Sequence, residues 1–179
     1  IRKDVQEKVR NEVSAIFGSK NGEPLKREDT LEMKYLECVI NEVLRLYPPI
    51  TLFGYEVETE ITIDQFVFPK GTSVSFPLRE IHRNEEFFPA ADHFKPERFE
   101  NINTSKFDCT FMPFGKGRRL CIGNKFAMLA MKILLANIVY NYCWTYVGKE
   151  SELTIKYLIG SSAASEVNLK FSKINNFSH

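Results

Sequence analysis

The chain has 179 residues, 44% of them hydrophobic and 13% aromatic, with a formal net charge of +1 at pH 7. This length suffices to bury a core, and the balanced charge gives no reason to expect a nucleic-acid partner. The four cysteines are scattered and no C-x-x-C motif occurs, which argues against a disulfide framework or a zinc site and favours a reducing compartment. The longest apolar run, around residues 128–139, is broken by Lys132 and Asn137 and is too short to cross a bilayer. The composition indicates part of a soluble globular protein.

Two helices are predicted in the first part of the chain. Apolar residues recur at helical spacing over residues 5–17 and a glycine follows, so a helix is expected from the first turn onward. Because no lead-in precedes it, we expect the chain to begin in the middle of a longer protein. After a polar loop at 19–28, Asp29 or Thr30 is expected to cap a second helix, which the proline pair at 48–49 ends.

Extended patterns follow, and then a segment without a period. Alternating apolar residues predict short strands around residues 61–63, 66–68 and 74–76. A turn is predicted at Pro69-Lys-Gly71. Residues 77–110 are rich in Pro, Phe and charge, which indicates a long ordered meander because its aromatic side chains need burial.

The last third of the chain is predicted to return to helix and then to strands. Apolar spacing predicts a helix over 122–140, and residues of about 142–171 are expected to form strands around a tip at Gly160–Ala164. No internal repeat, low-complexity tract or linker occurs. The sequence therefore predicts one domain of the α+β class, mainly helical with small β-sheets.

The loop at residues 114–123 carries the strongest chemical signal. A single cysteine, Cys121, follows two adjacent arginines, Arg118 and Arg119, among three glycines. A thiolate binds a soft or redox metal, an arginine can fork onto a carboxylate, and glycines let backbone approach a flat ring closely. The helix expected to start near Ile122 would favour the charged form of the sulfur. The alternative is a buried free cysteine in a glycine-rich turn.

A second signal is a pair of charges on the second predicted helix. Glu42 and Arg45 are three residues apart and therefore share one helix face. The helix is apolar around them, and the meander supplies Arg98 within Pro96-Glu-Arg-Phe99. A glutamate between two arginines can satisfy its lone pairs in a buried place. The alternative is an ordinary surface ion pair, worth about 0–1 kcal/mol.

These patterns resemble a known family. The spacing F-G-x-G-x-R-x-C-x-G resembles the haem-thiolate loop of the cytochrome P450 monooxygenases, and E-x-x-R followed by P-E-R-F resembles their structural charge triad. Further segments look like animal microsomal members, closest to the family-four branch associated with fatty-acid and hydrocarbon hydroxylation: Met33-Lys-Tyr-Leu36, Leu46-Tyr-Pro-Pro49, Phe68-Pro-Lys-Gly-Thr72 and His82-Arg-Asn84. The resemblance implies that residues 1–179 are the C-terminal half of one cytochrome P450 domain. Two positions depart from the family pattern: Ala130 replaces a usual Glu, and Tyr55 replaces a frequent basic residue near a haem propionate.

The resemblance also assigns roles to the residues of the loop. It implies haem b as cofactor, Cys121 as the axial thiolate ligand of the iron, and Arg119 as the partner of a haem propionate. Phe114 would cover the ligand side, Gly115 would belong to the cofactor pocket, and the N–H of Gly123 would point at the sulfur. Glu42, Arg45 and Arg98 would lock the meander beneath the loop and do no chemistry. Residues 50–54 and 161–164 would line the substrate cavity.

The implied activity is hydroxylation of a lipophilic substrate, a fatty acid or hydrocarbon, with dioxygen and reductase-supplied electrons. The implied partners are NADPH-cytochrome P450 reductase and, as a second candidate, cytochrome b5. The implied location is the cytosolic face of the endoplasmic reticulum membrane, with membrane contact through segments that this chain lacks. The fragment alone is expected to be inactive.

A basic patch of Lys116, Arg118 and Lys125 is expected near Cys121, with Lys106 and Lys132 as further candidates. An acidic reductase would dock there, and a solvated rim of lysines is the alternative.

Two other functions stay open at this point. A P450-fold isomerase or dehydratase would keep haem and cysteine without a reductase. A truncated product that holds no haem would be non-catalytic.

Overall fold

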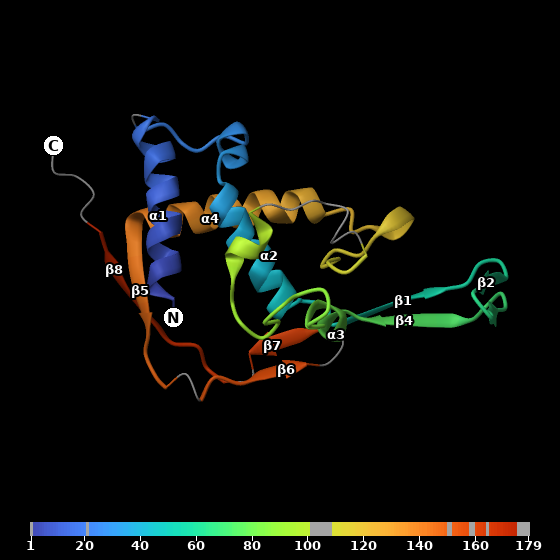
Figure 1. The fold of residues 1–179 in the computed structure, drawn as a ribbon. Coiled ribbons are helices and arrows are strands. Elements are labelled where there is room, and N and C mark those ends of the chain that lie inside the picture. The colour runs from blue at the N-terminus through green and yellow to red at the C-terminus, as the bar shows by residue number, and fades with distance from the viewer. Residues whose placement is uncertain are drawn as a thin grey trace.

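The computed structural model describes residues 2–20, 22–100, 109–149, 152–157, 160–163 and 165–174. Its helices within these ranges are α1 (Lys3–Gly18), α2 (Lys34–Leu46), α3 (Leu78–His82) and α4 (Asn124–Asn141), with short 3-10 helices η1 (Glu28–Leu31), η2 (Pro96–Phe99) and η3 (Gly117–Arg119). In Figure 1, α1, α2 and α4 cross one another at one end of the molecule, and a long β-arm projects from the other end. None of the helices in the described ranges combines the length and apolar character needed to traverse a bilayer.

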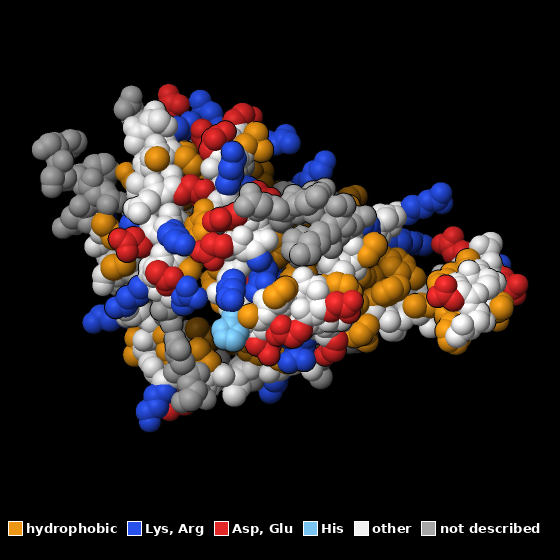
Figure 2. All heavy atoms as spheres, viewed as in Figure 1, with side chains coloured by type: hydrophobic (Ala, Val, Ile, Leu, Met, Phe, Trp, Pro, Cys, Tyr) orange, Lys and Arg blue, Asp and Glu red, His pale blue; other side chains and the backbone are white. Residues whose placement is uncertain are grey.

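Four antiparallel strand pairs complete the described fold. The pairs are β1 (Leu52–Glu56) with β4 (Ser73–Pro77), β2 (Ile61–Ile63) with β3 (Phe66–Phe68), β5 (Tyr142–Tyr146) with β8 (Leu169–Lys173), and β6 (Ile155–Tyr157) with β7 (Ser161–Ala163). The first pair forms the arm and the second pair lies at its far end, where apolar and acidic side chains gather on the surface (Figure 2). The mixed class expected from the sequence, helices with small sheets, is therefore confirmed.

The helical core follows from apolar periodicity. The buried side chains recur three and four residues apart on each helix, namely Val5, Val9 and Val13 on α1, Leu36, Ile40 and Leu44 on α2, and Ala136 and Val139 on α4. Full burial of such an aliphatic side chain is worth about 1.5–3 kcal/mol, so this face fixes how the three helices meet. Because α4 directly follows the loop at residues 114–123, which contains Cys121, the packing of α4 in the core also fixes one end of that loop.

The start of α2 differs from the prediction. Asp29 and Thr30 lie in η1, and α2 begins only at Lys34. Its N-terminal backbone N–H groups at Tyr35 and Leu36 donate to the carboxylate of Glu12 on α1, at 2.7 and 2.9 Å. The cap prediction was wrong because the capping carboxylate comes from another helix rather than from the residues just before α2.

The turn predicted between β3 and β4 is confirmed. Gly71 has φ +88°, a left-handed conformation that favours glycine, and its N–H donates to the carbonyl of Val57 at 2.8 Å. The N–H of Thr72 donates to the carbonyl of Pro69 at 3.1 Å. This turn brings the chain back from the end of the arm to form β4.

The structure departs from the prediction in three further segments. The meander contains α3, which is too short to leave a periodic pattern, and residues 101–108 of the meander lie outside the described residues. The last helix starts at Asn124 rather than near Ile122, because the residues after Cys121 first make a turn. Within the expected tip at 160–164, Gly160 forms an isolated bridge with Ile50, residues 161–163 form strand β7, and Ala164 lies outside the described residues.

Candidate functional site

The loop at residues 114–123, here called the cysteine loop, combines a tight turn at its start with a wider turn, and a hydrogen bond closes each of them. The N–H of Gly115 donates to the carbonyl of Met112 at 3.0 Å, and the N–H of Cys121 donates back to the carbonyl of Phe114 at 2.9 Å. Gly115 has φ +77° and Gly117 has φ +68°, so both turns use a backbone conformation that side-chain-bearing residues rarely adopt. The glycine spacing therefore has a geometric reason: it lets the chain fold back and present Cys121.

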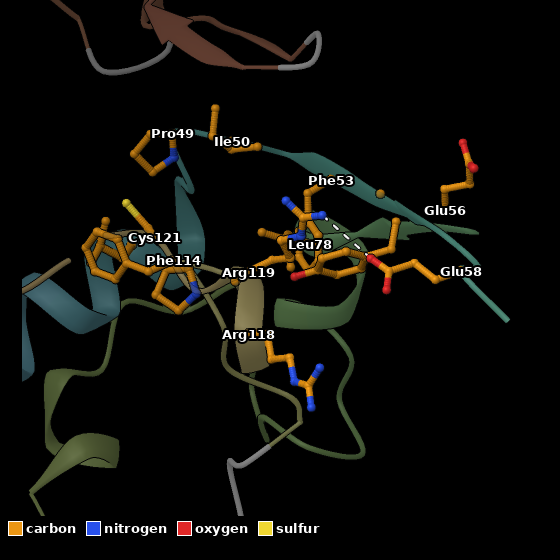
Figure 3. A pocket seen from close by; sticks show the side chains of 15 residues that line it. Pro49, Ile50, Phe53, Glu56, Glu58, Leu78, Phe114, Arg118, Arg119 and Cys121 are labelled. Atoms are coloured by element: carbon orange, nitrogen blue, oxygen red, sulfur yellow. Dashed lines mark ion pairs between the residues drawn. The ribbon is translucent and has the colours of Figure 1, made fainter. Parts of the chain in front are cut away.

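Cys121 opens onto a large hollow in the described part of the chain. The cleft has a volume of about 1050 Å³ and is lined by Leu44, Pro49, Ile50, Phe53, Gly54, Tyr55, Glu56, Glu58, Leu78, Pro113, Phe114, Gly115, Arg118, Arg119 and Cys121. Figure 3 shows the sulfur of Cys121 and the ring of Phe114 on one side of the hollow, with Pro49 and Ile50 above them. The cleft is thus mainly apolar, with a thiol in one wall and charges toward its other end.

The two arginines of the loop differ in direction. The guanidinium of Arg119 lies beside Phe53 and forms an exposed ion pair with Glu58, at 3.7 Å between Nη2 and Oε1 (Figure 3). The side chain of Arg118 points away from that pair (Figure 3). Both arginines line the cleft, and Arg119 is the one that already pairs with a carboxylate there.

Tyr55 ties the β-arm to the cysteine loop. Its hydroxyl donates to the backbone carbonyl of Lys116 at 3.2 Å, and an atom added at Gly115 would lie 3.8 Å from that hydroxyl. Its ring also packs edge-on against Phe53 and Phe76, with centroids 5.5 and 5.9 Å away. The phenol of Tyr55 therefore links β1, which forms part of the cleft wall, to the cysteine loop.

The residues of the cleft fit a flat, anionic, metal-bearing cofactor. A thiol supplies a soft ligand, Arg119 supplies a cation for a carboxylate, and the walls are apolar. Gly123 lies beside the sulfur: a Cβ added there would be 3.9 Å from Sγ of Cys121. Gly123 thus keeps the space beside the sulfur free of a side chain, which helps a ring to approach it.

Beneath the loop, Glu42, Arg45 and Arg98 form one network. The carboxylate of Glu42 receives two hydrogen bonds from Arg45, at 2.8 and 2.9 Å, and one from Nε of Arg98 at 3.2 Å. The backbone N–H of Lys95 adds a fourth, at 2.8 Å. The side chains of Glu42 and Arg45 are fully buried, so the surface ion-pair alternative is wrong.

The basic residues that were expected to form one surface patch near the loop differ in their exposure to solvent. Arg118 and Lys125 are exposed, and Lys116 is half-buried with its ammonium 4.0 Å from the sulfur of Cys109. Lys132 does not join them: it is buried, and its ammonium is bound by Glu37 at 2.5 Å and by the carbonyl of Thr30 at 2.9 Å. Lys106 lies outside the described residues.

Sequence reasoning missed contacts that reach across the fold. The sequence alone assigns His82 no role of its own, yet its imidazole accepts a hydrogen bond from the backbone N–H of Met112, next to the loop. Glu58 as a partner of Arg119 was also missed. Neither residue belongs to a local motif together with its partner, so no spacing in the chain could have revealed the contact.

Known proteins resemble this chain over most of its length. The family model described as Cytochrome P450 matches residues 2–169. The chain therefore belongs to the cytochrome P450 family.

Similar curated proteins include cytochrome P450 4d8 of Drosophila melanogaster, 34% identical over 96% of this chain and 38% of that protein. Cytochrome P450 3A40 of Oryzias latipes is 38% identical over 84% of this chain and 30% of that protein. Cytochrome P450 4g1 of Drosophila melanogaster is 41% identical over 79% of this chain and 26% of that protein. Members of the 4 and 3A branches are thus similarly close, and the chain spans about a third of the length of these relatives.

Proposed function

We propose that residues 1–179 form the C-terminal, haem-binding part of a single cytochrome P450 domain, and that the protein is a haem-thiolate monooxygenase. The observation that carries this proposal is the placement of the Cys121 sulfur in the wall of an apolar cleft that also contains Arg119. A soft ligand and a carboxylate-binding cation in one hollow are what an iron porphyrin with propionate groups requires. Membership of the family supports the same assignment.

Each residue of the cleft has a distinct task in this proposal. Cys121 binds the iron of haem b as a thiolate, and Arg119 holds a propionate. Phe114, which lines the cleft and packs on the helical core, excludes water from the ligand side. With haem bound, the N–H of Gly123 would donate toward the sulfur and tune its electron donation. Bound haem would supply the activation of dioxygen, which a thiolate ligand favours by promoting O–O cleavage.

The proposed substrate is lipophilic, a fatty acid or hydrocarbon. The apolar part of the cleft wall supports this, and the hairpin β6–β7 fixes that wall: Ser161 donates through Oγ to the carbonyl of Pro48 at 2.6 Å and through its N–H to that of Pro49 at 3.0 Å. We propose NADPH-cytochrome P450 reductase as electron donor, with cytochrome b5 as a second one. The proposed location is the cytosolic face of the endoplasmic reticulum, with membrane contact outside this chain; the chain alone is inactive in this proposal.

Turnover with isotopically labelled dioxygen tests the function. The protein as its gene encodes it, with any residues that flank this chain, is mixed with reductase, NADPH and a panel of fatty acids and hydrocarbons. We expect one labelled oxygen atom in the product and a strict requirement for NADPH. Conversion without NADPH would instead identify an isomerase or dehydratase.

Arg119→Ala is expected to weaken haem retention, while Arg118→Ala leaves it unchanged. A charge-assisted hydrogen bond contributes about 1.5–3 kcal/mol, so haem should leave Arg119→Ala about tenfold or more faster. Transfer of haem to excess apomyoglobin measures the rate. Glu58→Gln is the matched control, because it removes the same ion pair and keeps Arg119. Equal haem loss from the two arginine variants would contradict the assignment.

Reversing Lys116 and Lys125 to Glu is expected to slow turnover driven by the reductase. Lys116 lies within the loop of Cys121 and Lys125 lies just after it. A cationic surface steers an acidic partner in a manner that salt weakens. Turnover driven by peroxide, which needs no reductase, should stay normal, as should the haem spectrum. A parallel fall of both activities would show that these lysines maintain the haem site and do not dock a partner.

A further inference from the structure

His82 occupies a fully buried position between the charge network and the cysteine loop. It is the last residue of α3, which lies at the base of the β1–β4 arm (Figure 1), and its side chain has no exposed surface. Its ring packs at a tilt against Phe111, with centroids 5.4 Å apart. A histidine buried this completely is costly unless its polar groups are used.

His82 accepts two hydrogen bonds, one at its backbone carbonyl and one at its ring, from two different parts of the fold. Its carbonyl accepts a hydrogen bond from Nη1 of Arg45 at 2.8 Å, and its Nε2 accepts one from the backbone N–H of Met112 at 3.1 Å. One residue thus contacts both the buried network and the segment that leads into the cysteine loop.

From Met112 the connection continues to the thiol. The carbonyl of Met112 accepts the N–H of Gly115, which closes the first turn of the loop, and the carbonyl of Phe114 accepts the N–H of Cys121. Each of these hydrogen bonds positions the stretch of backbone that makes the next one. The position of the Met112 backbone therefore determines where the turn sits, and the turn determines where Cys121 is presented.

The ring nitrogen that faces Met112 must be unprotonated to accept this bond. Burial of the ring, and then the positive charge of Arg45, lower the pKa of His82 to about 4. The imidazole is therefore neutral at neutral pH. Its Nδ1 then carries the proton and has no hydrogen-bond partner within the described ranges, so the ring's polar contact is the one to Met112.

We infer that His82 is a positioning residue for the thiolate: its imidazole fixes the backbone of Met112 and thereby holds the cysteine loop in register with the Glu42–Arg45–Arg98 network. The inference rests on the proposed haem-thiolate function only for its consequence at the iron. The link itself, between a buried ring and the turn at Met112–Gly115, is a property of the protein without the cofactor.

The test compares His82→Phe with His82→Gln in the protein as its gene encodes it. Phenylalanine fills the space but removes the acceptor, whereas the amide oxygen of glutamine can take the place of Nε2. In the haem-free protein, the amide of Met112 should exchange its hydrogen at least about tenfold faster in His82→Phe, because its buried bond is lost, and His82→Gln should restore slow exchange. In the reduced carbon-monoxide complex, His82→Phe should convert much of the red-shifted Soret band of a thiolate-ligated haem to the blue-shifted form, and His82→Gln should keep the red-shifted band.

Phe99→Leu serves as the packing control, since the ring of Phe99 packs on the same Phe111 ring, with centroids 4.8 Å apart, and carries no hydrogen-bond acceptor to replace that of His82. It should leave both readouts as in the unmodified protein. Unchanged exchange at Met112 in His82→Phe, or equal effects in His82→Phe and His82→Gln, would overturn the inference. If the unmodified protein lacked the red-shifted band, the haem-thiolate function would fail, and the exchange comparison would still decide the role of His82.

Discussion

Glu42→Ala is expected to destabilise the folded protein by about 3–5 kcal/mol. The carboxylate is fully buried and is shared by two guanidinium groups, of which that of Arg45 is also fully buried. Removal of the carboxylate leaves a desolvated positive charge without its counter-ion, which is far costlier than the loss of an exposed pair. Urea unfolding followed by circular dichroism measures the change, and the expected phenotype is misfolded, haem-free protein rather than a slow enzyme.

A double-mutant cycle between Glu42 and Arg98 separates a network from two independent contacts. We expect non-additive effects in Glu42→Gln, Arg98→Met and the double variant, because Arg98 donates to Oε1 of Glu42, the same oxygen that accepts a hydrogen bond from Arg45. Lys8 and Glu97 offer the matched control: they pair at 2.7 Å while both side chains are about half exposed, so their coupling should stay within about 1 kcal/mol. Additive effects at Glu42 and Arg98 would reject the network.

The sequence alone predicts the parts of this fold that depend on local repetition. The spacing of Val5, Val9 and Val13 places them on one face of α1, and the same periodicity defines α2 and α4. The left-handed glycines of the cysteine loop are predictable for a similar reason, since Gly115 and Gly117 stand where only a special backbone closes the turn. Local rules suffice where the cause of a structure lies within a few residues.

Interactions between distant segments are not predictable in that way. The N-terminal end of α2 is bonded by Glu12, which lies 23 residues before Tyr35 along the chain, so the local candidates Asp29 and Thr30 were wrong. Lys132 reads as a surface cation in sequence, yet Glu37 from another helix neutralises it in a buried place. In each case a partner brought by the tertiary fold decides what a polar residue does.

The candidate site shows both situations side by side. Cys121 and Arg119 were predicted from the loop, and the structure brings them to the same cleft. Tyr55 and His82, which hold the loop in place through Lys116 and Met112, come from β1 and α3. The reactive groups of the site, Cys121 and Arg119, lie in one short segment. The residues that hold this segment in place come from distant parts of the chain.

Cys121→Ser is expected to abolish thiolate ligation completely while leaving the fold intact. The side chain of Cys121 is exposed and lines the cleft, so a serine of similar size costs little packing. A serine hydroxyl lacks the soft, electron-donating sulfur that the proposed iron ligand requires. Cys109→Ser and Cys143→Ser are matched controls, because both thiols are also exposed, and neither lines that cleft.

The absorption spectrum of the reduced carbon-monoxide complex tests the central claim most directly. It is recorded on the protein as its gene encodes it, before and after each cysteine is replaced. Our account predicts the red-shifted Soret band in the unmodified protein and in the Cys109 and Cys143 variants, and its complete loss in Cys121→Ser. An unchanged red-shifted band in Cys121→Ser, or its absence from the unmodified protein, would contradict the account.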